Sequence, residues 1–323
     1  MRVALSPAGR LRRPLPAVSG AAAIWALVLL AAVVAALLLP AFRSPENLAN
    51  LARQSAVLGL IALGQTFVIA AGLIDLSVGV IAGLVVVLAC ALMQGDPGAM
   101  VWVSAAMLAL GAGIGTVNGL LLNLLRLNPL ILTFGMLSVL QGAIFTFTDR
   151  SVGRPSPQLS ALANGSVMGV PHSLILLLAV AAALHVLLTR ARFGHHLLAA
   201  GGQPEAARRA GVNVERVRLA ALALAGFCAA AGGLVLAGRL GTGFPLAGAG
   251  LELDSIVAVV LGGALLAGGR ASVIGTLGGV LALAMLSNVL NLMGVSSFVQ
   301  TFVKGAVVVA AVILAQARRG GQA

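Results

Sequence analysis

The chain has 323 residues, of which 60% are hydrophobic and only 9% charged, and its formal net charge is +12 at pH 7. Repeated apolar runs long enough to cross about 30 Å of hydrocarbon indicate a polytopic membrane protein with no soluble catalytic domain. The arginines fall between these runs instead of along one polar face, so we interpret them as topology signals and expect no nucleic-acid partner.

Apolar runs bounded by Pro, Gly and charged residues predict ten membrane-spanning helices. In chain order they cover residues 19–39, 51–71, 76–93, 100–125, 130–147, 173–188, 217–238, 253–266, 273–292 and 298–317. We therefore expect one all-α transmembrane domain over residues 1–323. The first run follows a basic segment, as in a signal peptide, but it is too long for an h-region, so we expect it to be a retained span.

The distribution of arginines predicts the orientation of these spans. Four arginines precede the first span, six lie between Arg190 and Arg218, and two close the chain. Because cytoplasmic loops carry an excess of Lys and Arg, we expect a cytoplasmic segment over 1–18 and a cytoplasmic loop over 190–216. An even number of spans then places both termini in the cytoplasm.

Two segments of the chain are similar to later ones. AGLIDLSVGVIAGLVVVLA from Ala71 resembles AGLELDSIVAVVLGGALLA from Ala249, and IGTVNGLL from Ile114 resembles IGTLGGVL from Ile274. With ten spans, the members of each pair cross the membrane in opposite directions, which predicts an inverted-topology repeat. The alternative is coincidence in a chain rich in Gly, Leu and Val.

The first pair of similar segments carries acidic residues close to the predicted helix starts. Asp75 and Ser77 open the earlier segment; Asp254 opens the later one, which Gly262 and Gly263 interrupt. Short or glycine-broken spans at matching places in two halves mark a substrate pathway. Helix capping explains the same carboxylates, so Asp75 is predicted either to cap a helix or to contact substrate.

The other polar residues at membrane depth are mostly amides. Such groups suit a neutral, hydroxyl-rich solute, although hydrogen bonding between helices explains any one of them equally. The candidate residues of a translocation path are Gln65, Asp75, Ser77, Asn118, Gln141, Asn288 and Gln300. The histidines have no carboxylate or thiolate at ligand spacing, so we expect no metal site.

The segment GGQPEAARRAGVNV, from Gly201 to Val214, has the pattern of a short cytoplasmic helix. Pro204 suits a first turn, Glu205 favours the positive end of a helix, and Gly211 can end it. The side chains expected to matter for docking are Gly202, Ala206, Ala207 and Arg208 together with these three. The alanines would permit close approach, and the arginines would contact lipid headgroups or acidic residues of a partner.

Nucleotide and hydrolase motifs are absent from the sequence. The chain has one lysine, Lys304, in the apolar context FVKGAVVV, so it contains no GxxxxGK[ST] loop for nucleotide phosphates. It also lacks GxSxG and HExxH motifs, which makes an intramembrane hydrolase a poor interpretation.

Taken together, four segments resemble the membrane permeases of ribose-type sugar ATP-binding-cassette (ABC) importers. They are GLIDLSVG (72–79), NGLLLNLLRLNPLILTFGMLSVLQG (118–142), GGQPEAARRAGVNV (201–214) and VQTFVKGAVVVAAV (299–312). In the third segment, Glu205, Ala206, Ala207 and Gly211 reproduce the spacing by which importer permeases resemble one another at their ATPase-docking helix.

The resemblance implies the partners of the chain. It implies a dimer with a second copy or a related permease, cytoplasmic ABC ATPase subunits that hold ATP and Mg²⁺, and a periplasmic or lipid-anchored sugar-binding protein. This chain, in the inner membrane, would supply the gated path and no cofactor. Glu252 and Asp254 would form a gate or contact the binding protein, although capping explains Asp254 as well.

Two other functions fit part of the pattern. An ion-coupled secondary transporter also uses inverted repeats and broken helices, but it needs several intramembrane carboxylates, and few are present. Among importers, branched-chain amino acids are the nearest competing substrate, yet the DLSVG segment resembles the sugar branch. The sequence leaves the identity of the sugar open.

Overall fold

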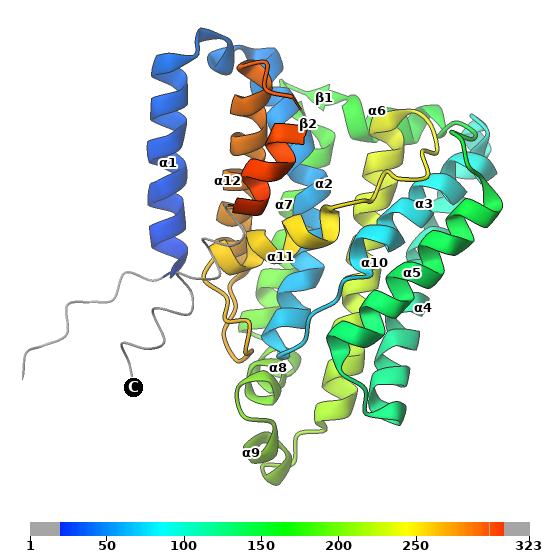
Figure 1. Ribbon diagram of the computed structural model, residues 1–323, viewed down its shortest axis with the longest axis vertical. Helices are drawn as coiled ribbons and strands as arrows, with labels where there is room; N and C mark the ends of the chain where they lie inside the picture. The colour runs from blue at the N-terminus through cyan, green and yellow to red at the C-terminus, as the bar shows by residue number, and fades with distance from the viewer. Residues whose placement is uncertain (1–19, 297, 307–323) are drawn as a thin grey trace, which may run out of the picture.

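The computed structural model describes residues 20–296 and 298–306 as an all-α bundle (Figure 1). The long helices are α1 (Gly20–Leu38), α2 (Pro45–Ala70), α3 (Val78–Met93), α4 (Met100–Leu125), α5 (Pro129–Phe147), α7 (His172–Thr189), α10 (Val214–Leu240), α11 (Leu251–Leu261) and α12 (Val273–Leu292). Shorter elements are η1 (Pro40–Arg43), η2 (Pro97–Ala99), α6 (Pro157–Asn164), α8 (Arg192–Gly202) and α9 (Pro204–Arg209), with strands β1 (Ser166–Val167) and β2 (Val170–Pro171) paired antiparallel. Residues 298–306 are also helical.

The prediction of ten spans is wrong: seven helices in the described part of the chain are long and apolar enough to cross a membrane. Two of the expected spans are too short, since α3 has 16 residues and α11 has 11. α11 ends at Leu261 because Gly263 adopts a φ of 90°, which a helix cannot include. The tenth expected span, 298–317, falls mostly outside the described residues.

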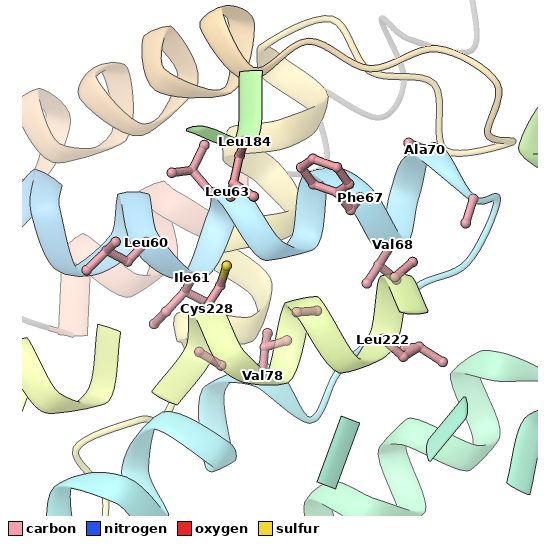
Figure 2. Close-up of a cluster of buried hydrophobic side chains, with 14 of the residues drawn as sticks. Leu60, Ile61, Leu63, Phe67, Val68, Ala70, Val78, Leu184, Leu222 and Cys228 are labelled. Atoms are coloured by element: carbon pink, nitrogen blue, oxygen red, sulfur yellow. The ribbon is translucent and has the colours of Figure 1, made fainter. Parts of the chain in front are cut away.

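The two halves of the bundle meet along α2 and α10, which form its core. In the most apolar part of α2, 83% of the residues are buried, whereas the figure for α5 is 11%. α2 and α10 approach closely because Gly64 lies against Ala225 and Cys228. Figure 2 shows the cluster around them, with Ile61 and Cys228 between α2 and α10.

The helix after each short helix packs on the core helix of the other half: α12 packs on α2, and α4 packs on α10. Thr66 of α2 shares a hydrogen bond of 2.8 Å with Thr276 of α12. On the other side of the core, Gly115 of α4 packs directly on the Leu222 carbonyl of α10. The segments that resemble each other in sequence therefore occupy corresponding places around α2 and α10.

α3 and α11 run in opposite directions (Figure 1). The end of α3 lies beside the end of α10, because Cys90 accepts a hydrogen bond from Arg154 and packs against Gly243. The loop after α11 instead returns to the end of α2, where the Gly269 amide donates to the Ala70 carbonyl over 3.0 Å. This antiparallel pair is the arrangement that an inverted repeat requires.

Candidate translocation and coupling site

Two short helices begin inside the bundle, each after a non-helical stretch. α2 ends at Ala70 and α3 starts at Val78, while α10 ends at Leu240 and α11 starts at Leu251. Their N-terminal ends touch: a Cβ atom at Gly79 would lie 2.8 Å from the Gly248 carbonyl oxygen and 2.9 Å from the Glu252 nitrogen. Only glycine fits this contact. Two helix N-termini, with their free N–H groups, therefore meet in the interior.

Three of the predicted path residues form one hydrogen-bonded cluster at the start of α3. Asp75 Oδ1 accepts hydrogen bonds from the Ser77 amide at 2.8 Å and the Ser77 hydroxyl at 2.6 Å, and Asn118 Nδ2 donates to that hydroxyl at 3.0 Å. All three side chains are fully buried. Asp75 Oδ2 and Asn118 Oδ1 have no partner among the described residues. The cluster therefore places a carboxylate at the positive end of α3 with hydrogen-bonding capacity to spare.

The other path candidates lie elsewhere in the bundle. Gln65 is fully buried on α2, and neither atom of its amide group has a partner in the described part of the chain. Asn288 exchanges two hydrogen bonds with Asn47, at 3.0 and 2.7 Å, and so ties α12 to α2. Gln300 donates to Asn291 at 2.7 Å. For Asn288 and Gln300, hydrogen bonding within the bundle is what the structure shows.

Gln141 links α5 to the non-helical stretch before α11. Its Nε2 donates to the Pro245 carbonyl over 3.4 Å, in the loop before α11. Nearer the start of α5, the Thr133 hydroxyl accepts a hydrogen bond over 3.1 Å from the amide of Leu76, which lies just before α3. α5 therefore contacts both non-helical stretches.

The two acidic residues at the start of α11 have different surroundings. Glu252 accepts from the Gly250 amide over 3.2 Å. Asp254 does not cap the helix, since the N-cap is Gly250; instead its Oδ2 pairs with Lys304 Nζ at 3.0 Å. Sequence reasoning missed Lys304 as a site residue because its partner lies 50 positions away in the chain.

The segment predicted to dock an ATPase folds as α9, which local sequence rules explain. Pro204 occupies the first turn with Glu205, and Gly211 adopts a φ of 85° just after the helix. The Gly211 amide donates to the Arg208 carbonyl at 2.9 Å and the Val212 amide to the Ala207 carbonyl at 3.0 Å. These two bonds form a Schellman motif, which satisfies the last carbonyls of the helix.

The side chains of α9 divide into an outer and an inner set. Glu205, Ala206 and Arg209 are exposed, whereas Ala207 is buried in the core of the bundle. The small side chain of Ala207 allows α9 to pack on its own chain, and the expectation that an alanine permits close docking of a partner stays a prediction for Ala206. Which side of such a short helix faces inward depends on tertiary packing, which the sequence does not show.

Arg208 forms ion pairs within its own chain. Its guanidinium contacts Glu205 at 2.7 Å and Glu215, in the first turn of α10, at 2.6 Å. The hydrogen bond that Arg208 donates to Glu215, together with the negative charges of Glu215 and Glu205, raises the pKa of Arg208, so its guanidinium stays charged. The pairing holds α9 against the start of α10, and Glu215 is a residue that sequence reasoning missed.

The coupling segment, which we define as α8 and α9, touches the stretch before α3 and the loop after α11 at one end of the bundle (Figure 1). Gly201 lies directly on the Ala70 carbonyl, and a Cβ atom at Gly72 would lie 3.3 Å from the Gly201 carbonyl oxygen. On its other side, a Cβ atom at Gly268 would lie 2.7 Å from the same oxygen. The stretch before α3 and the loop after α11 therefore both rest on Gly201.

Comparison with known proteins fits this architecture. The family described as branched-chain amino acid transport system / permease component matches residues 47–312, most of the chain. The chain belongs to this family. This permease is 39% identical over 296 residues to the ribose import permease protein of Bacillus subtilis, which covers 87% of this chain and 88% of that one. No solved structure matches it.

Further relatives of the permease carry names of the same kind. It is 38% identical over 294 residues to the ribose import permease protein of Escherichia coli K12, covering 90% of this chain and 91% of that one. It is 34% identical over 284 residues to the L-arabinose ABC transporter permease protein of Azospirillum brasilense, covering 88% and 84%. The permease is accordingly a multi-pass membrane transport subunit.

Proposed function

We propose that this permease forms the translocation path for a monosaccharide in an ATP-driven importer. The observation that carries the proposal is the contact of Gly201 with the stretch before α3, through Gly72, and with the loop after α11, through Gly268. It joins the docking region to the segments that flank α3 and α11, the two short helices whose N-termini meet inside the bundle. The names of the relatives, ribose and L-arabinose permeases, support a small sugar as the cargo.

The proposed mechanism follows from these contacts. A cytoplasmic ABC ATPase, which would hold ATP and Mg²⁺, docks on Glu205 and Ala206 of α9. Movement of the coupling segment is transmitted by backbone contacts, which are too close to absorb it by side-chain rotation. The α3 and α11 segments then shift between two packed arrangements, because packed interfaces switch between discrete states instead of deforming continuously. Their N–H groups offer donors to a hydroxyl-rich solute.

We propose that α5 faces a second copy of the permease or a related one. The exposed side of α5 carries Ser138 and Thr146 next to Gly135 and Gly142, and a Cβ atom at either glycine would meet nothing within 4 Å. Hydrocarbon does not favour polar residues, whereas small and polar residues suit a helix–helix interface. The path would then run beside α5, which contacts both non-helical stretches.

The orientation of the permease completes the proposal. α1 starts at the end of the bundle that holds α8 and α9, because α1 and α2 cross it in opposite directions (Figure 1). If α9 meets a cytoplasmic ATPase, the start of α1 lies on the cytoplasmic side, and we place the C-terminus there too because Arg318 and Arg319 favour that side. A sugar-binding protein would then deliver its cargo at the opposite end, near α6 and the β1–β2 hairpin.

Reconstitution in liposomes tests the function. With a cognate ATPase and binding protein, we expect uptake of labelled ribose or L-arabinose. This uptake should require ATP on the side of the membrane that holds the ATPase. Uptake by the permease alone, driven by a proton or sodium gradient, would instead establish the ion-coupled transporter. A protein that takes up a branched-chain amino acid and no sugar would refute the proposed cargo.

A further inference from the structure

We propose that each permease chain holds one binding site for a small polyhydroxylated solute in a polar cavity among α2, α10, α11, α12 and the helix 298–306. The inference rests on the proposed function and locates a sugar site within a single chain. The cavity measures about 180 Å³. Its polar lining consists of Gln54, Arg239, Asp254, Ser287 and Lys304, and its other walls are aliphatic.

Three charged residues line this cavity, which is unusual in a chain with so few of them. Only 9% of the chain is charged, yet an arginine, an aspartate and the one lysine of the sequence meet here between helices of the bundle. Arg239, Asp254 and Lys304 are only half-buried, but charged side chains between the helices of a membrane bundle are rare and costly. Charged groups kept at such a place in spite of that cost mark a solute site.

The charged groups keep part of their surface free for a ligand. The Asp254 and Lys304 side chains pair at 3.0 Å but retain 21% and 28% of their exposure. Arg239 uses Nη2 to bind Asn50 Oδ1 at 2.9 Å, and no other hydrogen bond of its guanidinium is seen in the described part of the chain. The lining therefore offers both donors and acceptors to an occupant.

This donor and acceptor set selects a neutral polyol. A carboxylate accepts from hydroxyl groups, while the ammonium and guanidinium donate to hydroxyl and ring oxygens; Gln54 and Ser287 do both. The aliphatic walls suit the C–H faces of a sugar ring. A cavity of about 150 Å³ holds a benzene ring, so a volume of about 180 Å³ suits a small solute with a single ring, such as a pentose.

The cavity lies beside α11, and the loop after α11 contacts the coupling segment. Asp254 is in the first turn of α11, next to Glu252, which contacts Gly79 at the start of α3. The other end of α11 leads to Gly268 beside Gly201. A sugar bound at Asp254 would therefore contact the element whose position the ATPase sets, so its affinity would differ between the two states.

Direct binding to the purified permease–ATPase complex, without the binding protein, tests the site. We would measure the binding of labelled ribose and L-arabinose by equilibrium dialysis, and we expect saturable binding of one sugar molecule per permease chain. The double variant Asp254→Asn, Lys304→Gln should bind at least about tenfold more weakly, since charge-assisted hydrogen bonds are lost. It removes both charges together, so neither is left unpaired in the bundle.

Two alanines on α12 provide a steric test that leaves the charges intact. Ala284 lines the polar cavity, whereas Ala282 lines a separate apolar groove beside α1. Ala284→Leu should abolish sugar binding by filling the cavity, and Ala282→Leu should bind as the wild type does. Size-exclusion profiles and ATPase activity would confirm that both variants fold and assemble.

Several outcomes would overturn the site. No saturable binding of either sugar to the wild type, or equal binding by Ala284→Leu and the wild type, would exclude it. Displacement of the label by inorganic phosphate but not by ribitol would refute the polyol class. ATP-driven sugar uptake is measured in parallel: uptake without binding refutes only the site, whereas binding without uptake counts only against the proposed function.

Discussion

The amide of Gly269 donates a hydrogen bond to the carbonyl of Ala70 over 3.0 Å and so joins the loop after α11 to the end of α2. Gly201 of the coupling segment packs on the same carbonyl. One peptide group therefore connects the docking region to both halves of the bundle. Because the contacts are made by backbone atoms, substitutions that enlarge a glycine here should disturb stability and coupling together.

Gly201→Ala should destabilise the permease by about 1–3 kcal/mol, because its new methyl group would overlap the Ala70 carbonyl. Gly202→Ala is the matched control, since its nearest contact would be 3.4 Å, to Gly269 Cα. Unfolding in mixed detergent micelles gives both free energies. Equal stability of the two variants would show that Gly201 does not hold the coupling segment against α2.

Gly79→Ala should also destabilise the permease by about 1–3 kcal/mol, because the N-terminal ends of α3 and α11 would be forced apart at Gly248 and Glu252. Gly113→Ala on α4 has open space around it and should leave stability unchanged or raise it slightly. Thermal unfolding of the two variants measures the difference. If Gly79→Ala is as stable as Gly113→Ala, the two half-helices do not meet as described.

Asp75→Ala should cost about 1–3 kcal/mol, because the buried amide and hydroxyl of Ser77 would lose their acceptor. Asp96 makes the same type of bond to the Gly98 amide at 2.8 Å, but it is exposed to solvent. Asp96→Ala should therefore cost only about 0.5 kcal/mol. Equal losses, measured by unfolding in mixed micelles, would contradict a buried role for the Asp75 cluster.

Arg208→Gln should leave the unfolding midpoint unchanged but weaken ATPase association, because α9 would no longer be held to Glu215. Arg209 is exposed and has no ion pair among the described residues, which makes Arg209→Gln the control. Co-purification of the ATPase with each variant measures the effect. A loss confined to Arg209→Gln would mean that direct contact by Arg209, not the position of α9, governs docking.

Local rules were sufficient for the docking helix. Proline at the first turn, an acidic residue after it and glycine at the end specify a short helix, and the structure has one from Pro204 to Arg209. The burial of Ala207 was not predictable, because it depends on the core that α9 packs against. The same limit applies to Asp254, whose partner Lys304 is distant in sequence.

Hydropathy predicted the membrane bundle but overcounted the spans. Hydropathy places the expected spans at 76–93 and 253–266, but α3 begins only at Val78 and α11 ends at Leu261, just before Gly263 adopts a positive φ. The resemblance between segments 71–89 and 249–267 nevertheless indicated the inverted pair, since a shared pattern records a shared backbone. The contact between the two short helices, at Gly79 and Glu252, could not be predicted from any local sequence pattern.

Co-purification with a cognate ABC ATPase tests the central claim, that α9 couples this permease to a separate ATPase, most directly. The comparison is Ala206→Trp, on the exposed side of α9, with Ala161→Trp, at an equally exposed position on α6. We expect the wild type and Ala161→Trp to retain the ATPase and Ala206→Trp to lose it. Retention by Ala206→Trp, or loss by Ala161→Trp alone, would contradict the claim.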